Sequence, residues 1–286
     1  MLKFLTLCIS GVMLGCIYGL IALGYGLIYK ASGLMSFVQG DMLTLGAFLG
    51  LPYWLSLLLT MLCAFAFGML LEKGVIRRLL NKKVMPIYVV LVTIAISYIL
   101  QNGSQLIWGT WTLNFPSVFK VSTVKLFGLL AVQPEVILCL ILSMVSMVVL
   151  HLFMNKTKLG TAMHASSMDS MAAESCGINV SLTTGITWGV SAMLAAMAGI
   201  LIGPMYGVYS SLGANLGNKG FAGAIAGGYG NMYGAIVGGI LLGLLEILVS
   251  GYVSSAYKNL IAYVALLLFL CIKPTGLFNE RAIQDV

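Results

Sequence analysis

The sequence predicts an all-α, polytopic membrane protein that forms one transmembrane permease domain over residues 1–286. Hydrophobic residues make up 60% of the chain and charged residues only 8%, and the mean hydropathy is +1.04. A soluble domain would carry about 25% charged residues. Two further observations point the same way, since apolar runs of spanning length recur along the chain and the basic residues gather in some of the connections. A soluble globular domain is therefore excluded.

Eight apolar runs approach the length of about 20 residues that a helix needs to cross about 30 Å of hydrocarbon. They are residues 4–28, 34–50, 53–76, 85–108, 136–153, 182–205, 233–249 and 260–272. A further segment, 219–229, rises only about 17 Å as a helix and is too short to cross. We therefore expect about eight transmembrane helices and a short re-entrant or half helix near residues 219–229, which enters the membrane partway and turns back.

The loop at about 155–181 is the only long polar stretch between apolar runs, and it predicts a short capped helix. Asp169 can accept backbone N–H bonds as an N-cap, residues 170–176 give about two helical turns, and Gly177 suits the left-handed position that ends a helix. A simple connection between two spans needs only a few flexible residues. A stiff helix here indicates a contact that transmits force to another protein.

The distribution of lysine and arginine predicts the orientation, because cytoplasmic loops are enriched in them. Placing loop 155–181 inside puts ten basic residues inside, namely Lys30, Lys73, Arg77, Arg78, Lys82, Lys83, Lys156, Lys158, Lys273 and Arg281. The outer set is Lys3, Lys120, Lys125, Lys219 and Lys258. We expect the N-terminus outside and the C-terminus inside, provided that region 219–249 forms a hairpin. The net charge of +7 is largely this bias and implies no nucleic-acid partner.

No enzymatic constellation is found in the sequence. It lacks a Gly-x-x-x-x-Gly-Lys-Ser/Thr phosphate loop, and its two histidines, His151 and His164, are better explained as contact residues than as catalysts. The six cysteines show no paired or metal-ligand spacing. We expect no catalytic residue, metal or cofactor in this chain, so any ATP that drives transport must be hydrolysed by another chain.

Glycines recur at four-residue spacing, a pattern typical of helices that pack with their backbones close together. The first helix carries Gly11, Gly15 and Gly19, and the pattern returns late in the chain. The cluster 227–231 differs, because three glycines in four positions break a helix and expose backbone groups that need protein or water around them. We therefore place Gly228, Gly230 and Asn231 at or near a transport path.

Ionisable groups within spans cost about 2.5–3.5 kcal/mol at a helix centre and usually face a cavity or a partner. Asp41 and Glu246 are the two that qualify, and Gln39 lies next to the first of them. Gln101 and Asn102 form a third polar spot. Each of these positions fits either a substrate path or a structural clamp that hydrogen-bonds to a neighbouring element.

Four motifs resemble the permeases of branched-chain amino-acid ABC importers, in particular the H-type subunit of the leucine/isoleucine/valine system. The segment 177–180, preceded by Met-Ala-Ala-Glu, looks like that family's cytoplasmic loop. The segment 37–41, Phe-Val-Gln-Gly-Asp, resembles its first motif, which ends in glycine and an acid. The segment 227–246 resembles its glycine-rich late region, and 273–278 resembles its closing Pro-Thr-Gly-Leu-Phe signature. Together they cover most of the chain.

The resemblance implies a permease of a bacterial or archaeal cytoplasmic membrane that pairs with a second, related permease. It also implies two cytoplasmic ATPases, which carry the ATP and Mg²⁺, and an external substrate-binding protein. Ala172, Ala173 and Gly177 match the Ala-Ala-x-x-x-Gly part of the coupling motif, while Met171 stands where the general motif has glutamate. The expected coupling residues are Asp169, Ala172, Ala173, Glu174 and Gly177.

The sequence thus predicts the permease subunit of an ABC importer for branched-chain or other apolar amino acids, working by alternating access. The expected substrate path comprises Gln39, Asp41, Gln101, Asn102, Gly228, Gly230, Asn231 and Glu246. One alternative is a related ABC permease for urea, nucleosides or sugars, which would differ in the polarity of the path. Another is an ion-coupled secondary transporter with broken helices and midplane acids, which would work without an ATPase.

Overall fold

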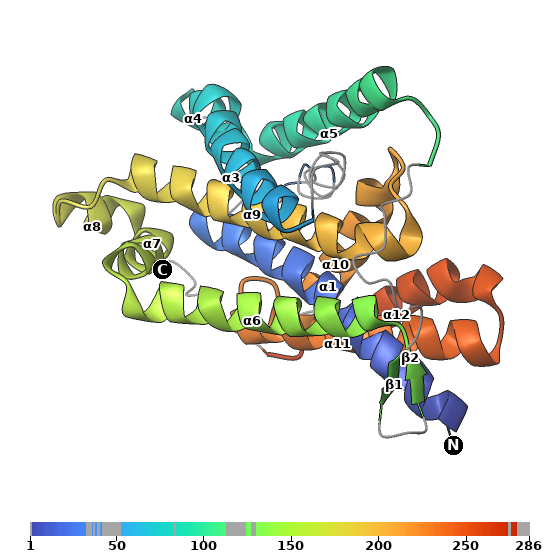
Figure 1. Ribbon diagram of the computed structural model, residues 1–286. Helices are drawn as coiled ribbons and strands as arrows, with labels where there is room; N and C mark the ends of the chain where they lie inside the picture. Colours follow the sequence, from blue (N-terminus) through green and yellow to red (C-terminus); the bar gives the residue numbers. More distant parts are fainter. Residues whose placement is uncertain are drawn as a thin grey trace.

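The computed structural model describes residues 2–32, 36, 38, 41, 53–82, 84–112, 124–126, 130–273 and 276–278. Within these ranges the protein is a bundle of α-helices with one small hairpin (Figure 1). The hairpin pairs β1 (Val124–Leu126) with β2 (Leu130–Val132) in antiparallel register. The helices are α1 (Leu2–Ser32), α3 (Tyr53–Leu71), the π-helix Glu72–Ile76, α4 (Arg77–Asn81), α5 (Pro86–Trp108), α6 (Pro134–Lys156), α7 (Lys158–Met168), α8 (Ser170–Ser175), α9 (Val180–Tyr206), α10 (Leu212–Gly227), α11 (Met232–Tyr252), the 3-10 turn Ser255–Tyr257 and α12 (Lys258–Ile272).

The predicted helical membrane class is confirmed. Six described helices are long and apolar enough to cross a membrane: α1, α3 with its continuation to Leu80, α5, α6, α9 and α11. The eighth run, 260–272, corresponds to α12, which has 15 residues and falls short of a full span by length. The run 34–50 lies outside the described residues except for Ser36, Val38 and Asp41. The six spans leave the predicted total of eight unconfirmed.

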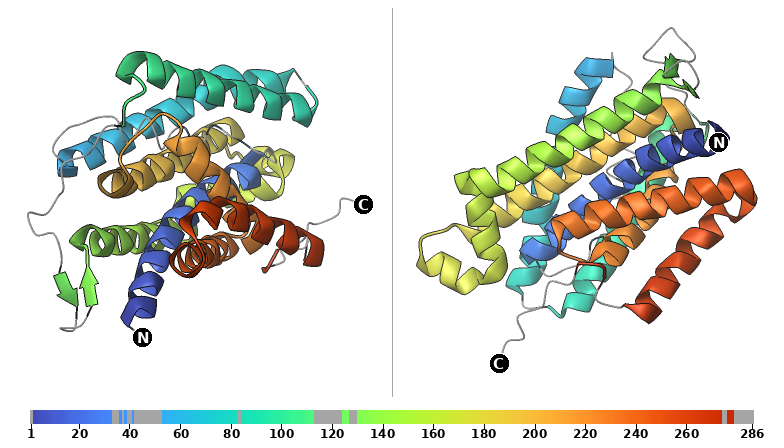
Figure 2. Two further views of the ribbon diagram at one scale, coloured as in Figure 1. Left: turned by 90° about the vertical axis from the view of Figure 1, so that its right-hand side faces the viewer. Right: turned by 90° about the horizontal axis from the view of Figure 1, so that it is seen from below.

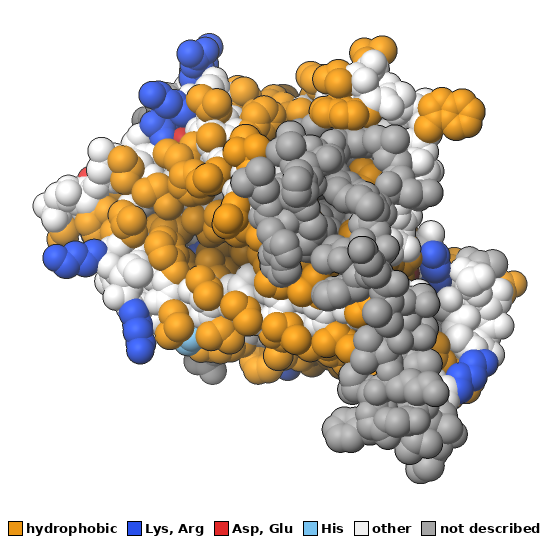
Figure 3. Space-filling view, in the orientation of Figure 1, with side chains coloured by type: hydrophobic (Ala, Val, Ile, Leu, Met, Phe, Trp, Pro, Cys, Tyr) orange, Lys and Arg blue, Asp and Glu red, His pale blue; other side chains and the backbone are white. Residues whose placement is uncertain are grey.

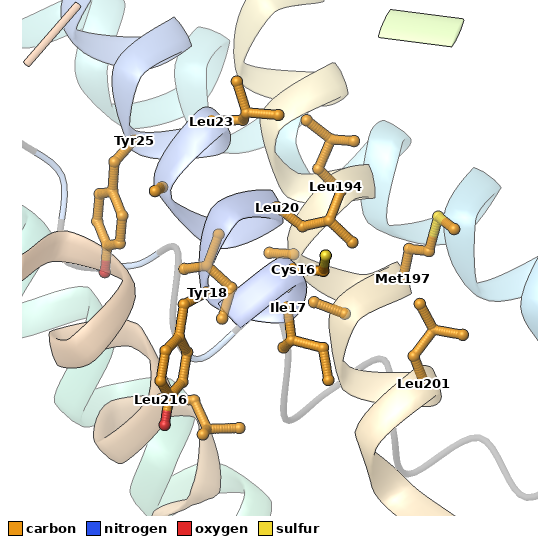
Figure 4. Packing of buried hydrophobic residues seen from close by; sticks show 14 of the residues in the cluster. Cys16, Ile17, Tyr18, Leu20, Leu23, Tyr25, Leu194, Met197, Leu201 and Leu216 are labelled. Carbon is orange, nitrogen blue, oxygen red and sulfur yellow. The ribbon is translucent and has the colours of Figure 1, made fainter. Parts of the chain in front are cut away.

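Helix α1 occupies the centre of the bundle and packs against α6, α9, α10 and α11. Cys16, Ile17 and Leu20 face α9, whereas Tyr18 points to the opposite side toward α10 (Figure 4). Figure 2 shows α3 and α5 on one side of the molecule and α11 with α12 on the opposite side. Because α1 is apolar around its whole circumference, as is typical of a fully surrounded helix, it becomes the core.

Close glycine packing joins α1 to α11. A Cβ atom added at Gly15 would lie 2.5 Å from the Cα of Ile240, and one added at Gly239 would lie 2.4 Å from the backbone N of Gly19. Gly11 meets Leu244 at one end of this contact. The two helices therefore run antiparallel with their backbones almost touching, and the predicted close packing is confirmed.

Helix α10 corrects the prediction of a half helix at 219–229. The helix begins earlier, at Leu212, and its 16 residues rise about 24 Å before it ends at Gly227. It runs antiparallel to α11, with Lys219 beside Glu246 and Gly227 beside Gly234. Lys219 is therefore a buried helix residue, 6% exposed, and not a loop lysine. The first turns of α10 were not predicted from the sequence, because Asn215 and several glycines lower the apolar content there.

The turn between α10 and α11 lies at one end of the bundle and not halfway along it. Gly230 approaches Gly26 of α1, and Tyr233 lies beside His151 near the end of α6. The end of α6 leads directly into α7 and α8, so all these segments share one end, here called the α8 end. The predicted hairpin is present, since α10 runs to the α8 end and α11 returns from it.

Candidate functional site

Helix α8 is capped at both of its ends, as predicted from the sequence. The Oδ1 atom of Asp169 accepts the backbone N–H groups of Met171 and Ala172 at 2.9 and 3.0 Å. Gly177 has a φ of 83°, donates its N–H to the carbonyl of Glu174, and is followed by a bond from Ile178 N to Ala173 O at 3.0 Å. This pair of bonds closes the helix as a Schellman motif. The caps at both ends therefore make α8 a rigid helix within the loop.

The two faces of α8 have different surroundings. Ala173 is only 5% exposed because α8 rests against α7 and α9, whereas Met171 is 79% exposed and the preceding Met168 is 67% exposed. Ala172 and Glu174 also lie on the exposed side. Of the predicted coupling residues, Ala173 contacts its own chain, whereas Asp169, Ala172, Glu174 and Gly177 are exposed. A partner could reach these four residues and the neighbouring Met171.

An ion pair between Glu72 and Arg77, which also binds the carbonyl of Ser181, lies next to α8 and is called the latch below. The π-helix in α3 carries Glu72, which is 3% exposed and accepts two bonds from the guanidinium of Arg77 at 3.0 and 2.5 Å. The same Arg77 Nη2 donates to the carbonyl of Ser181, in the first turn of α9, at 2.5 Å. The extra residue of a π-turn often marks a functional position. The latch connects α3 to the chain directly after α8.

Asp41 lies beside a polar cavity between α1, α5 and α10. Its carboxylate is 2% exposed, and Oδ2 accepts a hydrogen bond from the hydroxyl of Ser97. Ser97 lines a cavity of about 220 Å³ together with Gln101, Tyr25 and Asn218. Among the described residues, the Oδ1 atom of Asp41 has no hydrogen-bond partner. Gln101 therefore lines the cavity, and Asp41 is connected to it through the hydrogen bond from Ser97.

Asn102 does not share that cavity. It is exposed, and its Nδ2 atom donates to the carbonyl of Tyr98 on its own helix at 2.7 Å. A step of one residue along a helix turns the side chain by about 100°, which separates Asn102 from Gln101. Gln39, the remaining predicted neighbour of Asp41, lies outside the described residues.

Glu246 forms a buried cluster that joins three helices. Its Oε1 atom lies 2.5 Å from the Nζ atom of Lys219 on α10, and its Oε2 atom accepts the hydroxyl of Tyr18 on α1 at 2.8 Å. Glu246 and Lys219 are 4% and 6% exposed. This arrangement favours the clamp interpretation of Glu246, because both carboxylate oxygens are occupied by partners in the protein.

The glycine cluster at 227–231 contacts residues 276–278, which follow α12 in the chain. Gly228 has a φ of 114°, and a Cβ there would lie 2.7 Å from the carbonyl oxygen of Phe278. The backbone N–H groups of Leu277 and Phe278 donate to the carbonyls of Ala226 and Gly227 at 3.1 and 3.0 Å. The closing segment thereby satisfies carbonyls that the end of α10 leaves unpaired. Gly228 serves this close approach, while Gly230 and Asn231 line a different cavity at the α8 end.

Several site residues were missed by sequence reasoning. Ser97 and Asn218 gave no signal, because a lone small polar residue in an apolar helix usually bonds to its own backbone. Lys219 was counted among the outer basic residues, and its pairing with Glu246 depends on antiparallel packing across 27 positions. A lysine in an otherwise apolar, glycine-rich helix was the available signal for a buried partner.

Comparisons with known proteins show the family of the chain. Residues 7–270 match the family model described as the permease component of branched-chain amino acid transport systems. The chain is 29% identical to the high-affinity branched-chain amino acid transport system permease protein LivH of Salmonella typhimurium and to that of Escherichia coli K12. Each alignment covers 100% of this chain and 98% of the relative. No solved structure matches the chain with statistical significance. Because the family model spans nearly the whole bundle, the chain belongs to the branched-chain amino acid transport system permease family.

Proposed function

We propose that this chain is the permease subunit of an ATP-binding cassette importer for branched-chain or other apolar amino acids in a bacterial or archaeal cytoplasmic membrane. The observation that carries the proposal is α8, a doubly capped helix that stands at one end of the bundle with Met168 and Met171 exposed. Exposed methionines on a rigid helix suit a groove in a partner protein. The partner would be an ATPase subunit, which supplies ATP and Mg²⁺ chemistry that this chain does not perform.

The proposed assembly contains this chain, a second related permease, two ATPases at the α8 end and a substrate-binding protein at the opposite end. This arrangement puts the α8 end in the cytoplasm and the N-terminus of α1 outside. Basic residues support it, because Lys82, Lys156 and Lys158 are exposed at the α8 end. Because Lys219 is buried against Glu246, it no longer counts among the outer basic residues. The proposed orientation then has ten basic residues inside and four outside.

The proposed substrate path runs through the cavity between α5 and α10. Its wall combines the apolar Ile94 and Tyr25 with the polar Ser97, Gln101 and Asn218. An amino acid with an apolar side chain needs such a mixture, in which a few polar groups bind the charged ends. In this proposal Asp41 would attract the ammonium group, which is supported by its bond to the cavity-lining Ser97 and by the lack of a partner for its Oδ1 atom among the described residues. The path would open alternately to the two sides as the ATPases close and reopen.

Reconstitution of the complete complex in proteoliposomes tests the proposal. We expect uptake of labelled leucine, isoleucine or valine to require ATP and the binding protein, and to survive a protonophore. Ala172→Arg should reduce ATPase co-purification and uptake at least tenfold, because it adds bulk and charge to the docking face. Thr161→Arg, an exposed position on α7, is the matched control and should leave both unchanged.

The same measurement separates the alternatives. Uptake without ATP that collapses with the protonophore would instead identify an ion-coupled secondary transporter. ATP-dependent uptake of urea, a nucleoside or a sugar, with no competition by leucine, would keep the ABC mechanism and change the cargo. Full activity of Ala172→Arg would remove α8 as the docking element.

A further inference from the structure

A second cavity, of about 210 Å³, lies at the α8 end between α1, α6, α7 and α11. Both histidines of the chain line it, His151 from α6 and His164 from α7. Lys30 of α1, Asn155 and Tyr233 complete the polar side. These residues come from four helices, α1, the consecutive helices α6 and α7, and α11, so the fold assembles the group from three separate parts of the sequence. None of them takes part in the proposed substrate path or in the α8 surface.

The polar side of this cavity carries several hydrogen-bond donors. Lys30 supplies an ammonium group, and an imidazole offers at least one N–H in either charge state. The Nδ2 atom of Asn155 lies 3.1 Å from the ring nitrogens of His151, and the Tyr233 hydroxyl lies 3.3 Å from His151 Nδ1. Within the described ranges, no Asp or Glu lines the cavity. Such a set is suited to an anion.

The start of α11 adds to the positive potential. Gly230, Asn231 and Met232 line the same cavity, and they form the N-terminus of a helix of 21 residues. Asn231 Oδ1 accepts the N–H groups of Tyr233 and Gly234 at 3.0 and 3.1 Å, which fixes the first turn in place. The helix dipole directs its positive end toward the cavity, where it attracts negative charge.

The remaining wall is apolar and continues onto a lipid-exposed surface. Leu23, Leu27 and Met154 line the cavity beside the donors. From there an apolar face runs along α6, where Val145, Val148, Val149 and Leu152 are between 42% and 58% exposed. Hydrophobic side chains cover α6 on this side of the molecule (Figure 3). A ligand that fills the cavity can therefore be charged at one end and apolar at the other.

We propose that this cavity binds the phosphate group of an anionic phospholipid. The phosphodiester would lie against Lys30, His151 and His164, and the acyl chains would follow the apolar face of α6. Basic pockets between membrane helices recognise anionic head groups in this way. A zwitterionic head group would place its own cation among the donors and bind less well. The proposal concerns a phosphate ester, and free inorganic phosphate shares that chemistry without the acyl chains.

Binding to the purified, delipidated complex tests the proposal independently of transport, so it can fail while the proposed function stands. We expect phosphatidylglycerol to bind and to raise the melting temperature, as followed by native mass spectrometry and thermal unfolding. Phosphatidylcholine should have a much smaller effect. Lys30→Gln should weaken phosphatidylglycerol binding about fivefold, and His164→Gln, at an exposed position that tolerates change, should weaken it in the same direction.

Lys82→Gln is the matched control, because Lys82 is exposed at the α8 end on the far side of the bundle and does not line the cavity. It removes the same charge and should leave binding unchanged. Equal protection by inorganic phosphate and by phosphatidylglycerol would overturn the lipid assignment in favour of a free anion. Equal losses in Lys82→Gln and Lys30→Gln, or no loss in His164→Gln and Lys30→Gln, would overturn the site itself.

Discussion

At the residue scale, the two buried acids have different environments. Both carboxylate oxygens of Glu246 are occupied, by the ammonium group of Lys219 and by the hydroxyl of Tyr18. Asp41 binds only Ser97 through one oxygen, and the other has no partner among the described residues. An occupied carboxylate stabilises the packing of three helices, whereas one with free capacity can bind a ligand. The two acids are therefore expected to respond differently to neutralisation.

Glu246→Gln should destabilise the protein. The amide leaves the buried Lys219 without a counterion, which costs about 3–5 kcal/mol in stability. Thermal unfolding of the purified complex measures this loss. The double variant Glu246→Gln/Lys219→Met removes both charges and should recover much of it, because an apolar side chain of similar size fits the site. A single variant as stable as the parent would refute the clamp assignment.

Asp41→Asn should reduce uptake at least tenfold and leave the melting temperature nearly unchanged. Asparagine keeps the volume and an oxygen that accepts from Ser97, but it removes the charge that, in the proposed path, would attract an ammonium group. Uptake and thermal unfolding are measured on the same preparation, with Ser97→Ala as a comparison that keeps the charge. Normal uptake with lowered stability, on the scale of about 1–3 kcal/mol for an unpaired buried group, would identify Asp41 as structural instead.

At the scale of elements, helix ends and helix contacts follow different rules. The ends of α8 depend on nearby residues, and Asp169 and Gly177 cap it as the sequence predicts. The buried face of α8 depends on α7 and α9, which the sequence does not show. Substitution of Ala173 would therefore disturb the loop itself, and Ala172 is the better test of docking. Glycine contacts between α1 and α11 are likewise set by two distant segments.

Gly15→Val should prevent α1 and α11 from packing. The added Cβ would meet the Cα and carbonyl oxygen of Ile240 at 2.5 and 2.8 Å, and a backbone cannot move aside as a side chain can. The expected result is a loss of folded, monodisperse protein after extraction from the membrane, measured by size-exclusion chromatography. Gly103→Val is the control, because nothing lies within 4 Å of its Cβ position. Equal yields of the two variants would contradict the close contact.

At the scale of the whole molecule, two groups of helices share the central helix α1. One group contains α10, α11 and α12 and is joined by the Glu246 cluster and by the docked segment at Leu277 and Phe278. The other contains α3 and α9, and α9 directly follows the exposed helix α8 in the chain. Arg77 connects α3 to the first turn of α9. A force applied at α8 would therefore reach α3 through this latch.

Arg77→Gln should uncouple ATP hydrolysis from transport. Loss of the bidentate contact leaves Glu72 poorly paired and frees the start of α9 from α3, at a cost of about 1.5–3 kcal/mol. We expect ATPase activity to persist while the amount of amino acid taken up per ATP falls several-fold in proteoliposomes. Arg78→Gln is the matched control, since Arg78 is the exposed neighbour. An unchanged ratio in Arg77→Gln would show that the latch is only structural.

The sequence by itself determined that the chain lies in lipid, that it is helical, and where the short helix α8 begins and ends. An apolar run of about 20 residues crosses lipid as a hydrogen-bonded helix, and six of the predicted runs form helices long and apolar enough to span in the structure. The caps of α8 were also readable, because Asp169 and Gly177 act on residues within a few positions. These properties depend on composition and on neighbours along the chain.

Only the tertiary structure decided which polar residues meet. Lys219 pairs with Glu246, Asp41 meets Ser97, and Gly228 receives Phe278, each across a long separation in sequence. The full length of α10 and the burial of Ala173 were also decided by packing. In a membrane helix any face can be apolar, so periodicity does not reveal which face turns inward. The antiparallel contacts of α1, α10 and α11 make that choice, because close approach is possible only where their glycines coincide.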